Sequence, residues 1–284
     1  MNVTAGAQQA TGAMAGTLPL AGLSVLLTRP AGQADKLAAA IQGLGGQVTH
    51  LPLLAIEPIT ERVAVERLKT SIMALDNYDA AIFISTNAAT LGLEWIESYW
   101  PQLPVGLEAY AVGPGTAEIL RQLPWPVHCS ESGVTSEHLL ALPGLQDVAG
   151  KRIALFRGQG GRELLAETLR ERGARVDYLE IYQRRVPEYS RAVVLKMIEE
   201  NAIDTVIATS QQILDSLIAL LSADGNLPQK MRGLRVVVPS QRVREFALAA
   251  GFKLVIDAGG ADDKSVLTSL EQCQTGSAND KETT

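Results

Sequence analysis

The sequence of 284 residues is poor in cysteine and histidine, and each shortage excludes a class of protein. Its two cysteines, Cys129 and Cys273, are too few for a disulfide framework or a cysteine-rich zinc module. Its three histidines are His50, His128 and His138, and no two of them stand three or four residues apart, the spacing of a helical metal site. We therefore expect no metal centre.

The chain also lacks excess positive charge and long hydrophobic runs. The formal net charge is -6, which argues against a surface that tracks nucleic-acid phosphates. No apolar run reaches the ~18 residues that a membrane-spanning helix needs. The first basic residue is Arg29, whereas a secretory signal begins with a basic region. These features predict a cytoplasmic protein that binds neither nucleic acid nor a membrane.

What the sequence does contain is enough apolar residues for two cores. The hydrophobic fraction is 46% and the charged fraction 20%, so a folded protein with two domains of roughly 130 residues is expected. Residues 1–18 and 272–284 show no apolar periodicity, and we expect both to be unstructured tails.

Between the tails, short apolar runs alternate with stretches of helical periodicity. Each run is followed by a cluster of small, polar or proline residues that begins the next helix. The runs are continuously apolar, as in strands that helices cover on both faces. The pattern predicts an α/β fold of parallel sheets. The strands are expected at Val25–Leu27, Ala81–Ile84, Tyr110–Val112, Ile153–Phe156, Val206–Ala208 and Val236–Val238.

The sequence also contains an internal repeat. Arg29 aligns with Arg157 at a separation of 128 residues, and the surrounding residues match as a strand, an arginine-bearing turn, a helix ended by glycine, and a second strand. Ser85 and Ser210 align at a separation of 125, so small deletions shift the register. Two copies of one fold are expected.

Two proline-bounded segments follow the two copies and look like connectors. Residues 53–58 and 180–187 are each about one strand long and begin no further strand–turn–helix unit. If both cross between lobes, one lobe is discontinuous and contains residues 19–52 and 188–271. The other lobe then contains residues 59–179, and a cleft separates the two.

Candidate ligand-binding residues follow the predicted strands. In parallel sheets, ligands bind outside the carboxyl ends of the strands, where helix N-termini offer free N–H groups. Small hydroxyl residues, amides, glycines and arginines at that edge would bind an anion with several charges. Each serine or threonine could instead be an ordinary helix cap. The candidates are Arg29, Ser85, Thr86, Asn87, Gly113, Thr116, Arg157, Gly158, Arg162, Ser210, Gln211 and Ser240.

Motifs for nucleotide cofactors do not match. The segment from Gly144 to Lys151 has the wrong spacing for a phosphate-binding loop, and Arg152 follows where serine or threonine is required. The run Gly158–Gly161 lacks the third glycine of the dinucleotide fingerprint, because Glu163 stands in its place. We therefore expect no cofactor.

Several of these segments together resemble the uroporphyrinogen-III synthase family. The likeness extends from about Leu20 to Leu270, and the order and spacing of its motifs are more specific than any one of them. The segments that carry it are Val25–Pro30, Leu51–Pro58, Tyr78–Ala88, Ala111–Ala117, Leu179–Arg185 and Pro239–Val243.

The resemblance implies two flavodoxin-like lobes joined by a two-stranded linker, in a cytoplasmic monomer. It implies that hydroxymethylbilane, which carries eight carboxylates, is dehydrated and cyclised with inversion of ring D to uroporphyrinogen III, in heme and siroheme biosynthesis. A transient hand-off of this substrate from porphobilinogen deaminase would fit. Tyr182 matches the family's connector tyrosine, which would donate a hydrogen bond to the departing water or else pack in the hinge. Phe156 stands where the first copy has Thr28, so the lobes are not expected to make equivalent contacts.

Two alternatives stay open at this point. One is a bilobed protein that binds an anionic small molecule without chemistry. The other is a regulatory relative of the synthase that has lost its activity.

Overall fold

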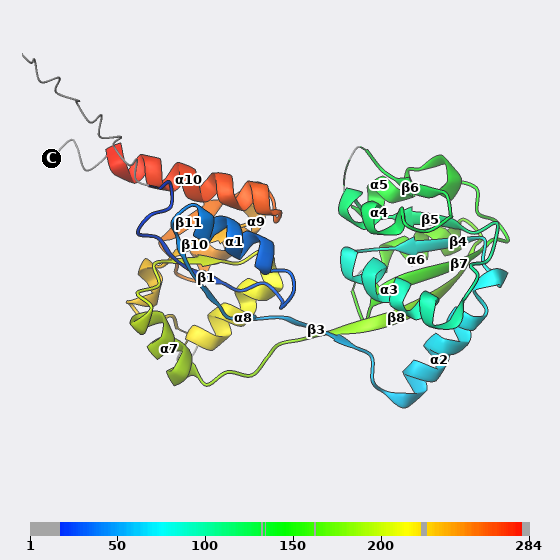
Figure 1. Ribbon diagram of the computed structural model, residues 1–284, viewed down its shortest axis with the longest axis horizontal. Coiled ribbons are helices and arrows are strands. Elements are labelled where there is room, and N and C mark those ends of the chain that lie inside the picture. Colours follow the sequence, from blue (N-terminus) through cyan, green and yellow to red (C-terminus); the bar gives the residue numbers. More distant parts are fainter. Residues whose placement is uncertain (1–17, 132, 134, 162, 223–225, 280–284) are drawn as a thin grey trace, which may run out of the picture. The chain divides into compact units, whose positions relative to one another are not determined.

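The chain forms two compact units, shown as ribbons in Figure 1. The computed structural model describes residues 18–131, 133, 135–161, 163–222 and 226–279. Unit 1 comprises Met1–Leu54 and Val186–Thr284, and unit 2 is the continuous segment Ala55–Arg185. The two chain segments that pass between the units therefore run from Leu54 to Ala55 and from Arg185 to Val186.

Unit 1 is built on a five-stranded sheet in which every neighbouring pair is parallel. The strand order is β11-β10-β9-β1-β2. The strands are β1 (Ser24–Leu27), β2 (Gln47–His50), β9 (Thr205–Ile207), β10 (Arg235–Val238) and β11 (Leu254–Asp257). The helices are α1 (Asp35–Gly43), α7 (Arg191–Glu200), α8 (Gln211–Leu221), α9 (Gln241–Ala249) and α10 (Asp263–Asn279), with a short 3-10 helix η3 (Met231–Gly233).

Both faces of this sheet are buried. In β1, Leu26 belongs to one core, which also contains Leu217 of α8, whereas Val25 and Leu27 belong to a second core, which contains Leu37 of α1. Because successive side chains of a strand point to opposite faces, a strand covered on both sides must be apolar throughout. Burial of both sheet faces therefore explains why the strand runs of the sequence are continuously apolar, as predicted.

Unit 2 is built on a six-stranded sheet with the order β3-β8-β7-β4-β5-β6. Its strands are parallel except at the pair β3 and β8, which is antiparallel. The strands are β3 (Ala55–Pro58), β4 (Ala80–Phe83), β5 (Glu108–Ala111), β6 (Val127–Cys129), β7 (Arg152–Gly158) and β8 (Arg175–Arg185). The helices are α2 (Arg62–Met73), α3 (Thr86–Tyr99), α4 (Pro114–Leu120), α5 (Ser136–Leu140) and α6 (Leu164–Glu171), with 3-10 helices η1 (Leu75–Asn77) and η2 (Pro143–Leu145).

Strand β8 joins the second connector to the sheet without a break. Residues expected to form a separate connector from residue 180 instead continue the strand that begins at Arg175. Its last part pairs with β3, from Tyr182 opposite Pro58 to Arg185 opposite Ala55. The boundary expected at residue 180 therefore falls inside a strand, and Tyr182 is held by the sheet of unit 2.

The internal repeat is visible as a shared strand order. If β7 and β8 are matched with β1 and β2, and β4, β5 and β6 with β9, β10 and β11, both units show the flavodoxin-type order 2-1-3-4-5. The α/β fold of parallel sheets predicted from the sequence is confirmed. In each unit, the strands matched as 1 and 2 come from one half of the sequence, and the strands matched as 3, 4 and 5 come from the other half.

The chain ends differ in part from the expectation. Residues 1–17 lie outside the described residues, and Leu18 is exposed. Helix α10 continues to Asn279, well into the segment from residue 272 that was expected to be unstructured. Cys273 is half-buried on this helix, and burial raises the pKa of its thiol. No described helix is long and apolar enough to cross a membrane.

A glycine in α3 tests how tightly the core of unit 2 is packed. A Cβ added at Gly92 would lie 2.9 Å from Cδ1 of Phe156 and 3.0 Å from Cε1 of Phe83, and these two rings stack with centroids 4.3 Å apart. We expect Gly92→Ala to lower the free energy of unfolding by about 1–3 kcal/mol, because overpacking outweighs the gain in helix propensity. Urea unfolding followed by circular dichroism measures the change. The control is Gly115→Ala, whose Cβ would lie an ordinary 3.5 Å from Thr86; an equal effect in both variants would contradict the packing argument.

Candidate active site

The predicted ligand-binding residues of unit 2 stand where strands end and helices begin. Ser85 follows β4, Gly113 follows β5, and Gly158 is the last residue of β7. Because β4, β5 and β7 are parallel, these positions share the carboxyl edge of one sheet. Tyr182 lies opposite Gly158 in β8 and belongs to the same edge.

Tyr182 is fully buried, with a relative exposure of 0%. Its hydroxyl oxygen lies 3.3 Å from Oγ of Ser85, and Nη2 of Arg184 donates to it at 3.4 Å. The guanidinium carbon of Arg184 is 5.7 Å from the centre of the tyrosine ring. The buried phenol is therefore held between a serine hydroxyl and an exposed cation.

Arg184 was not among the residues predicted from the sequence. It stands two residues after Tyr182, and alternate residues of a strand point to the same face. This spacing could have identified Arg184 from the sequence. If residues 180–185 are taken as a strand, Arg184 lies on the same face as Tyr182 and becomes a candidate site residue.

Gly158 leaves the space in which the tyrosine ring lies. A Cβ at this position would be 2.4 Å from Cε2 and 2.6 Å from Cζ of Tyr182, closer than any real side-chain contact. The ring therefore rests on the backbone of β7, where a bulge shifts the register between Arg157 and Gly158. Only glycine is compatible with this ring position.

Ser85 has two roles at this edge. Its Oγ accepts a hydrogen bond from the Ala88 N–H at 3.1 Å and so caps helix α3, and the same oxygen is the neighbour of Tyr182. Thr86 and Asn87 form the first turn of α3, where Thr86 is exposed and Asn87 is half-buried. The cap interpretation and the binding interpretation of Ser85 are thus compatible.

Arg157 was expected to bring positive charge to a ligand, but its guanidinium serves its own loop. The side chain is only 2% exposed. It donates from Nη1 to Oε1 of Glu163 at 3.1 Å, from Nε to the carbonyl of Gly158 at 3.3 Å, and from Nη2 to the carbonyl of Gly160. The structure gives Arg157 a part in shaping the loop after β7, and ligand binding by it stays a prediction.

A cavity of about 260 Å³ lies beside this loop. Arg157, Gly158, Gly160, Gly161 and Arg184 line it, together with Ile84, Val112, Ser136, Leu155 and Leu165. Of the predicted ligand-binding residues it contains Arg157 and Gly158. Ser136 was missed, because it begins the short helix α5 after a segment with no clear periodicity.

The two predicted residues after β5 are structural in this conformation. Gly113 has φ 92°, a left-handed backbone conformation that favours glycine, and Pro114 begins α4 directly after it. Thr116 is 3% exposed, and its hydroxyl donates to the carbonyl of Val112 at 3.2 Å. Binding of a ligand by the Thr116 hydroxyl is therefore without support from the geometry.

In unit 1, Arg29 anchors the loop that precedes α10. The side chain is largely buried; Nη2 donates to the carbonyl of Ala261 at 2.6 Å, and Nη1 pairs with the carboxylate of Asp263. Like Arg157, Arg29 uses its N–H groups in hydrogen bonds to other residues of the chain. In the same loop, hydrogen bonds from Ser265 hold the pKa of Asp262 below its usual value.

The remaining predicted residues begin helices of unit 1. Ser210 caps α8 by accepting from the Ile213 N–H at 3.2 Å, and Oε1 of Gln211 accepts from Arg242 at 2.5 Å. Ser240 precedes α9, and its side chain makes no capping bond. Arg162 lies outside the described residues.

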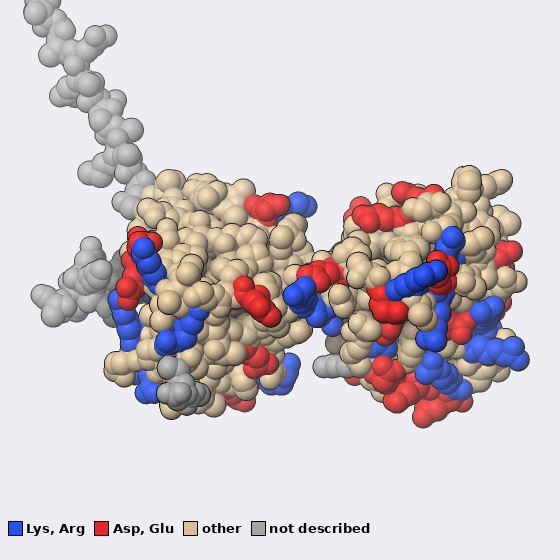
Figure 2. All heavy atoms as spheres, turned by 90° about the horizontal axis from the view of Figure 1, so that it is seen from below, with Lys and Arg blue, Asp and Glu red and all other residues tan. Residues whose placement is uncertain are grey.

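On the face shown in Figure 2, charge is distributed without a broad field of one sign. Figure 2 shows acidic and basic side chains interspersed over the displayed face of each unit. Among the described residues, no group of three or more His, Cys, Asp or Glu side chains is placed to hold a metal ion. The chemistry of the edge described above is that of hydroxyls, backbone N–H groups and Arg184.

Comparison with known proteins decides the family. Residues 35–267 match the family model of uroporphyrinogen-III synthase HemD. The chain belongs to the uroporphyrinogen-III synthase family. It is 31% identical over 258 residues to the uroporphyrinogen-III synthase of Escherichia coli K12, a match that covers 88% of this chain and 100% of that protein. It is 39% identical over 171 residues to the enzyme of Proteus mirabilis, covering 59% of this chain and 83% of that protein.

Solved structures of uroporphyrinogen-III synthases share the fold. A mutant enzyme from Thermus thermophilus matches with a TM-score of 0.53 at 18% identity, covering 87% of this chain and 96% of that one. The enzyme from Helicobacter pylori matches with a TM-score of 0.52 at 14% identity, covering 87% and 97%. The resemblance inferred from the sequence motifs is thereby confirmed.

The contact between Gly158 and Tyr182 can be tested with a double-mutant cycle. We expect Gly158→Ala to lower the free energy of unfolding by about 1–3 kcal/mol, because its Cβ must displace the tyrosine ring. In a Tyr182→Ala background the same substitution should cost much less, since the ring is gone. Equal costs in the two backgrounds, measured by urea unfolding, would show that the ring does not set the requirement for glycine.

The loop after β7 predicts an acid-dependent stability. Hydrogen bonding from Tyr178, followed by the charge of Arg157, lowers the pKa of Glu163 below its usual value. A lowered folded-state pKa gives stability that is present above the unfolded pKa and is lost as pH falls through the folded one. Glu163→Gln should therefore lose less unfolding free energy than the native protein between pH 6 and pH 3, in urea titrations at fixed pH steps. An identical pH dependence for both proteins would contradict the pairing.

Proposed function

We propose that this protein converts hydroxymethylbilane into uroporphyrinogen III, with loss of water and inversion of ring D. Membership of the family supports the reaction. The observation that supports a reaction site at Tyr182 is the contact of its phenol with Ser85 and Arg184. The net reaction removes one water and changes no oxidation state. Positioning of the chain ends and stabilisation of developing charge are therefore the main tasks of the protein.

Tyr182 has the chemistry to assist the first step. Departure of the substrate hydroxyl as water leaves an azafulvene cation, an electrophile that ring D attacks. The resulting spiro intermediate fragments and recloses. In the proposal the Tyr182 hydroxyl donates a hydrogen bond to the departing oxygen, and Ser85 fixes the direction of the phenol. The ring is fully buried and Arg184 is the exposed member of the group, so in the proposal the substrate approaches the phenol from the side of Arg184.

The carboxylates of the substrate require many donors. In the proposal they are bound at the carboxyl edges of both units by helix N-termini and side chains. Because Arg29 and Arg157 already pair with carboxylates of the chain, the proposal gives most of this binding to hydroxyl, amide and backbone N–H groups. Its members are Ser85, Thr86, Asn87, Gly113, Gly158, Arg162, Ser210, Gln211 and Ser240, with Arg184 added from the structure.

The cellular setting is part of the same proposal. The protein acts in the cytoplasm as a monomer and takes its unstable linear substrate from porphobilinogen deaminase. The family match does not favour the binding or regulatory function without catalysis that the sequence left open, and the isomer assay below tests it directly.

The decisive measurement couples porphobilinogen deaminase to this protein. After oxidation, the porphyrin isomers are separated by chromatography. We expect isomer III well above the level of isomer I that forms spontaneously. Formation of isomer I alone, at the rate seen with deaminase and no second protein, would rule out the synthase and favour the binding function.

Tyr182→Phe tests the donor role in the same assay. Loss of a positioned proton donor should lower kcat by about 10²-fold or more with a smaller change in KM. The matched control is Tyr78→Phe, since Tyr78 is also buried in unit 2 but donates to Asp177 at 2.9 Å, and burial raises its pKa to about 12. The control should keep its turnover. If Tyr182→Phe keeps it as well, Tyr182 is a packing residue.

A further inference from the structure

The outer edge of β8 is only partly paired. Strand β7 runs along one side of β8 from Arg175 onward, but β3 covers the other side only from Tyr182 to Arg185. Along residues 176–180, no described strand pairs with that outer side. A stretch of open strand edge is a template on which another extended chain can pair.

Backbone groups of this stretch point outward. The Arg175 N–H donates to the carbonyl of Lys151 at 2.8 Å, which turns the backbone of Arg175 toward β7. Because successive residues of a strand direct their N–H and C=O groups to opposite sides, those of Val176, Tyr178 and Glu180 face the open edge. The guanidinium of Arg170 donates to the Val176 carbonyl at 2.9 Å, as expected of a carbonyl outside the ladder.

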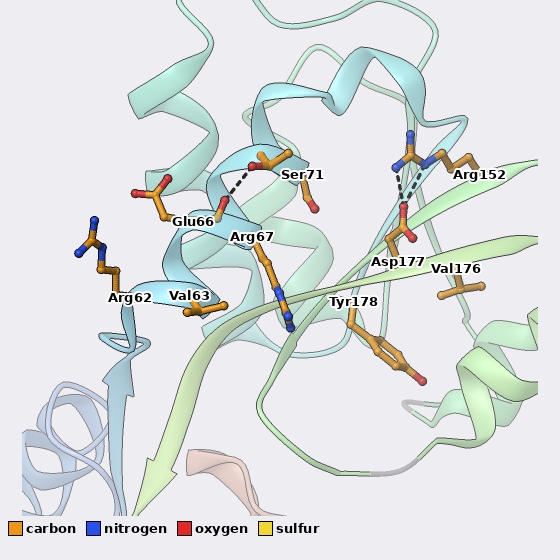
Figure 3. A pocket seen from close by; sticks show the side chains of 10 residues that line it. Arg62, Val63, Glu66, Arg67, Ser71, Arg152, Val176, Asp177 and Tyr178 are labelled. Atoms are coloured by element: carbon orange, nitrogen blue, oxygen red, sulfur yellow. Dashed lines mark hydrogen bonds and ion pairs between the residues drawn. The ribbon is translucent and has the colours of Figure 1, made fainter.

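An open groove of about 680 Å³ lies between this edge and helix α2 (Figure 3). The wall formed by α2 contributes Arg62, Val63, Glu66, Arg67, Thr70 and Ser71, and the other wall contributes Arg152 and Val176–Tyr178. In Figure 3 the side chain of Arg67 extends from α2 toward the strand. Val63 is 55% exposed, so an apolar side chain in the groove would find a partner there.

The groove favours an acidic occupant. Arg152 is neutralised by Asp177, to which it donates at 2.8 and 2.9 Å. The side chains of Arg62 and Arg67 make no hydrogen bond or ion pair with another described residue, although the charge of Arg67 adds to the backbone hydrogen bonds that lower the pKa of Glu61 at the start of α2. Within the lining, the two arginines outweigh Glu66, the remaining acid. These two arginines are five residues apart, or about 7.5 Å along the helix. Five residues also turn a helix by about 140°, so the two side chains lie on different faces of α2; in Figure 3 Arg67 extends toward the strand and Arg62 away from it. Arg67 is therefore the cation that an acid of the occupant meets in the groove.

We propose that this groove binds an extended, acidic segment of another protein, which adds a strand to the outer edge of β8. The added backbone pairs with the outward groups of Tyr178 and Glu180, and one of its carboxylates reaches Arg67, with Arg62 adding positive charge at the same end of α2. Affinity then comes from the main-chain bonds and selectivity from the side-chain contacts, as in other cases of strand addition. This interaction is independent of the proposed synthase activity.

The probe is a fluorescein-labelled, seven-residue peptide of alternating glutamate and valine, titrated with the full chain and followed by fluorescence anisotropy. Two control peptides replace every glutamate by lysine, or the central valine by proline, which cannot donate to the edge. We expect the acidic peptide to bind at least about tenfold more tightly than either control. Equal affinity for all three peptides would overturn the proposal.

Variants locate the binding. The double substitution Arg62→Ala with Arg67→Ala should weaken binding about tenfold, whereas Arg62→Lys with Arg67→Lys should retain most of it. The control is Arg121→Ala, an exposed arginine of unit 2 paired with Glu118 and absent from the groove lining. Unchanged affinity in the double alanine variant, or an equal loss in Arg121→Ala, would refute the assignment. Matching thermal midpoints exclude unfolding as the cause.

Hydrogen exchange separates strand pairing from binding by charge alone, because only pairing protects the backbone amides of β8. Bound peptide should slow exchange of the Tyr178 and Glu180 amides, while those of β6, at the far edge of the sheet, stay unchanged. Protection elsewhere, or none, overturns the proposal. So does competition by free glutamate at equal carboxylate concentration, which would indicate a small-anion site. A dimer in light scattering that excludes the peptide would show that a second copy of the chain occupies the edge.

Discussion

The ring of Tyr182 lies directly on the backbone of Gly158, and the arrangement of the candidate site depends on that contact. A side chain at residue 158 would push the ring away from Ser85, and the phenol would lose its neighbour at 3.3 Å. The extra residue of β8 opposite the end of β7 and the length of β8 have the same effect, because together they bring a residue of the second connector into the sheet. The catalytic proposal therefore rests on a packing constraint in the sheet of unit 2.

The two arginines related by the internal repeat show how equivalent positions acquire different contacts. Arg29 pairs with Asp263 and so fastens α10, whereas Arg157 pairs with Glu163 within its own loop. The residues before them also differ: the Thr28 hydroxyl donates to the Ile207 carbonyl at 2.6 Å, and Phe156 stacks on Phe83. Both of these side chains are fully buried, so the departure between the copies alters the two cores.

Much of the fold was predictable because local sequence determines it. Apolar runs followed by turns of small, polar or proline residues located β1, β4 and β10, and the order of these motifs indicated the family. The site was less predictable, because burial depends on contacts between distant residues. From the sequence, Arg29 was expected to be free to bind a ligand. In the structure it pairs with Asp263, which is 234 residues away in the sequence. Arg184 was missed because the second connector was taken as a separate segment, when its residues lie on a strand with Tyr182.

The interleaved repeat has a consequence for how the protein is made. Strands β1 and β2 are synthesised early, but their sheet lacks a neighbour for β1 until β9 has been made. Unit 2, in contrast, is complete as soon as Arg185 has left the ribosome. Its two ends, Ala55 and Arg185, are partners in one ladder, so the nascent chain enters and leaves this unit at the same place. The unit encoded in the middle of the gene is thus the first whose residues are all available, and the unit that contains the N-terminal strands is the last.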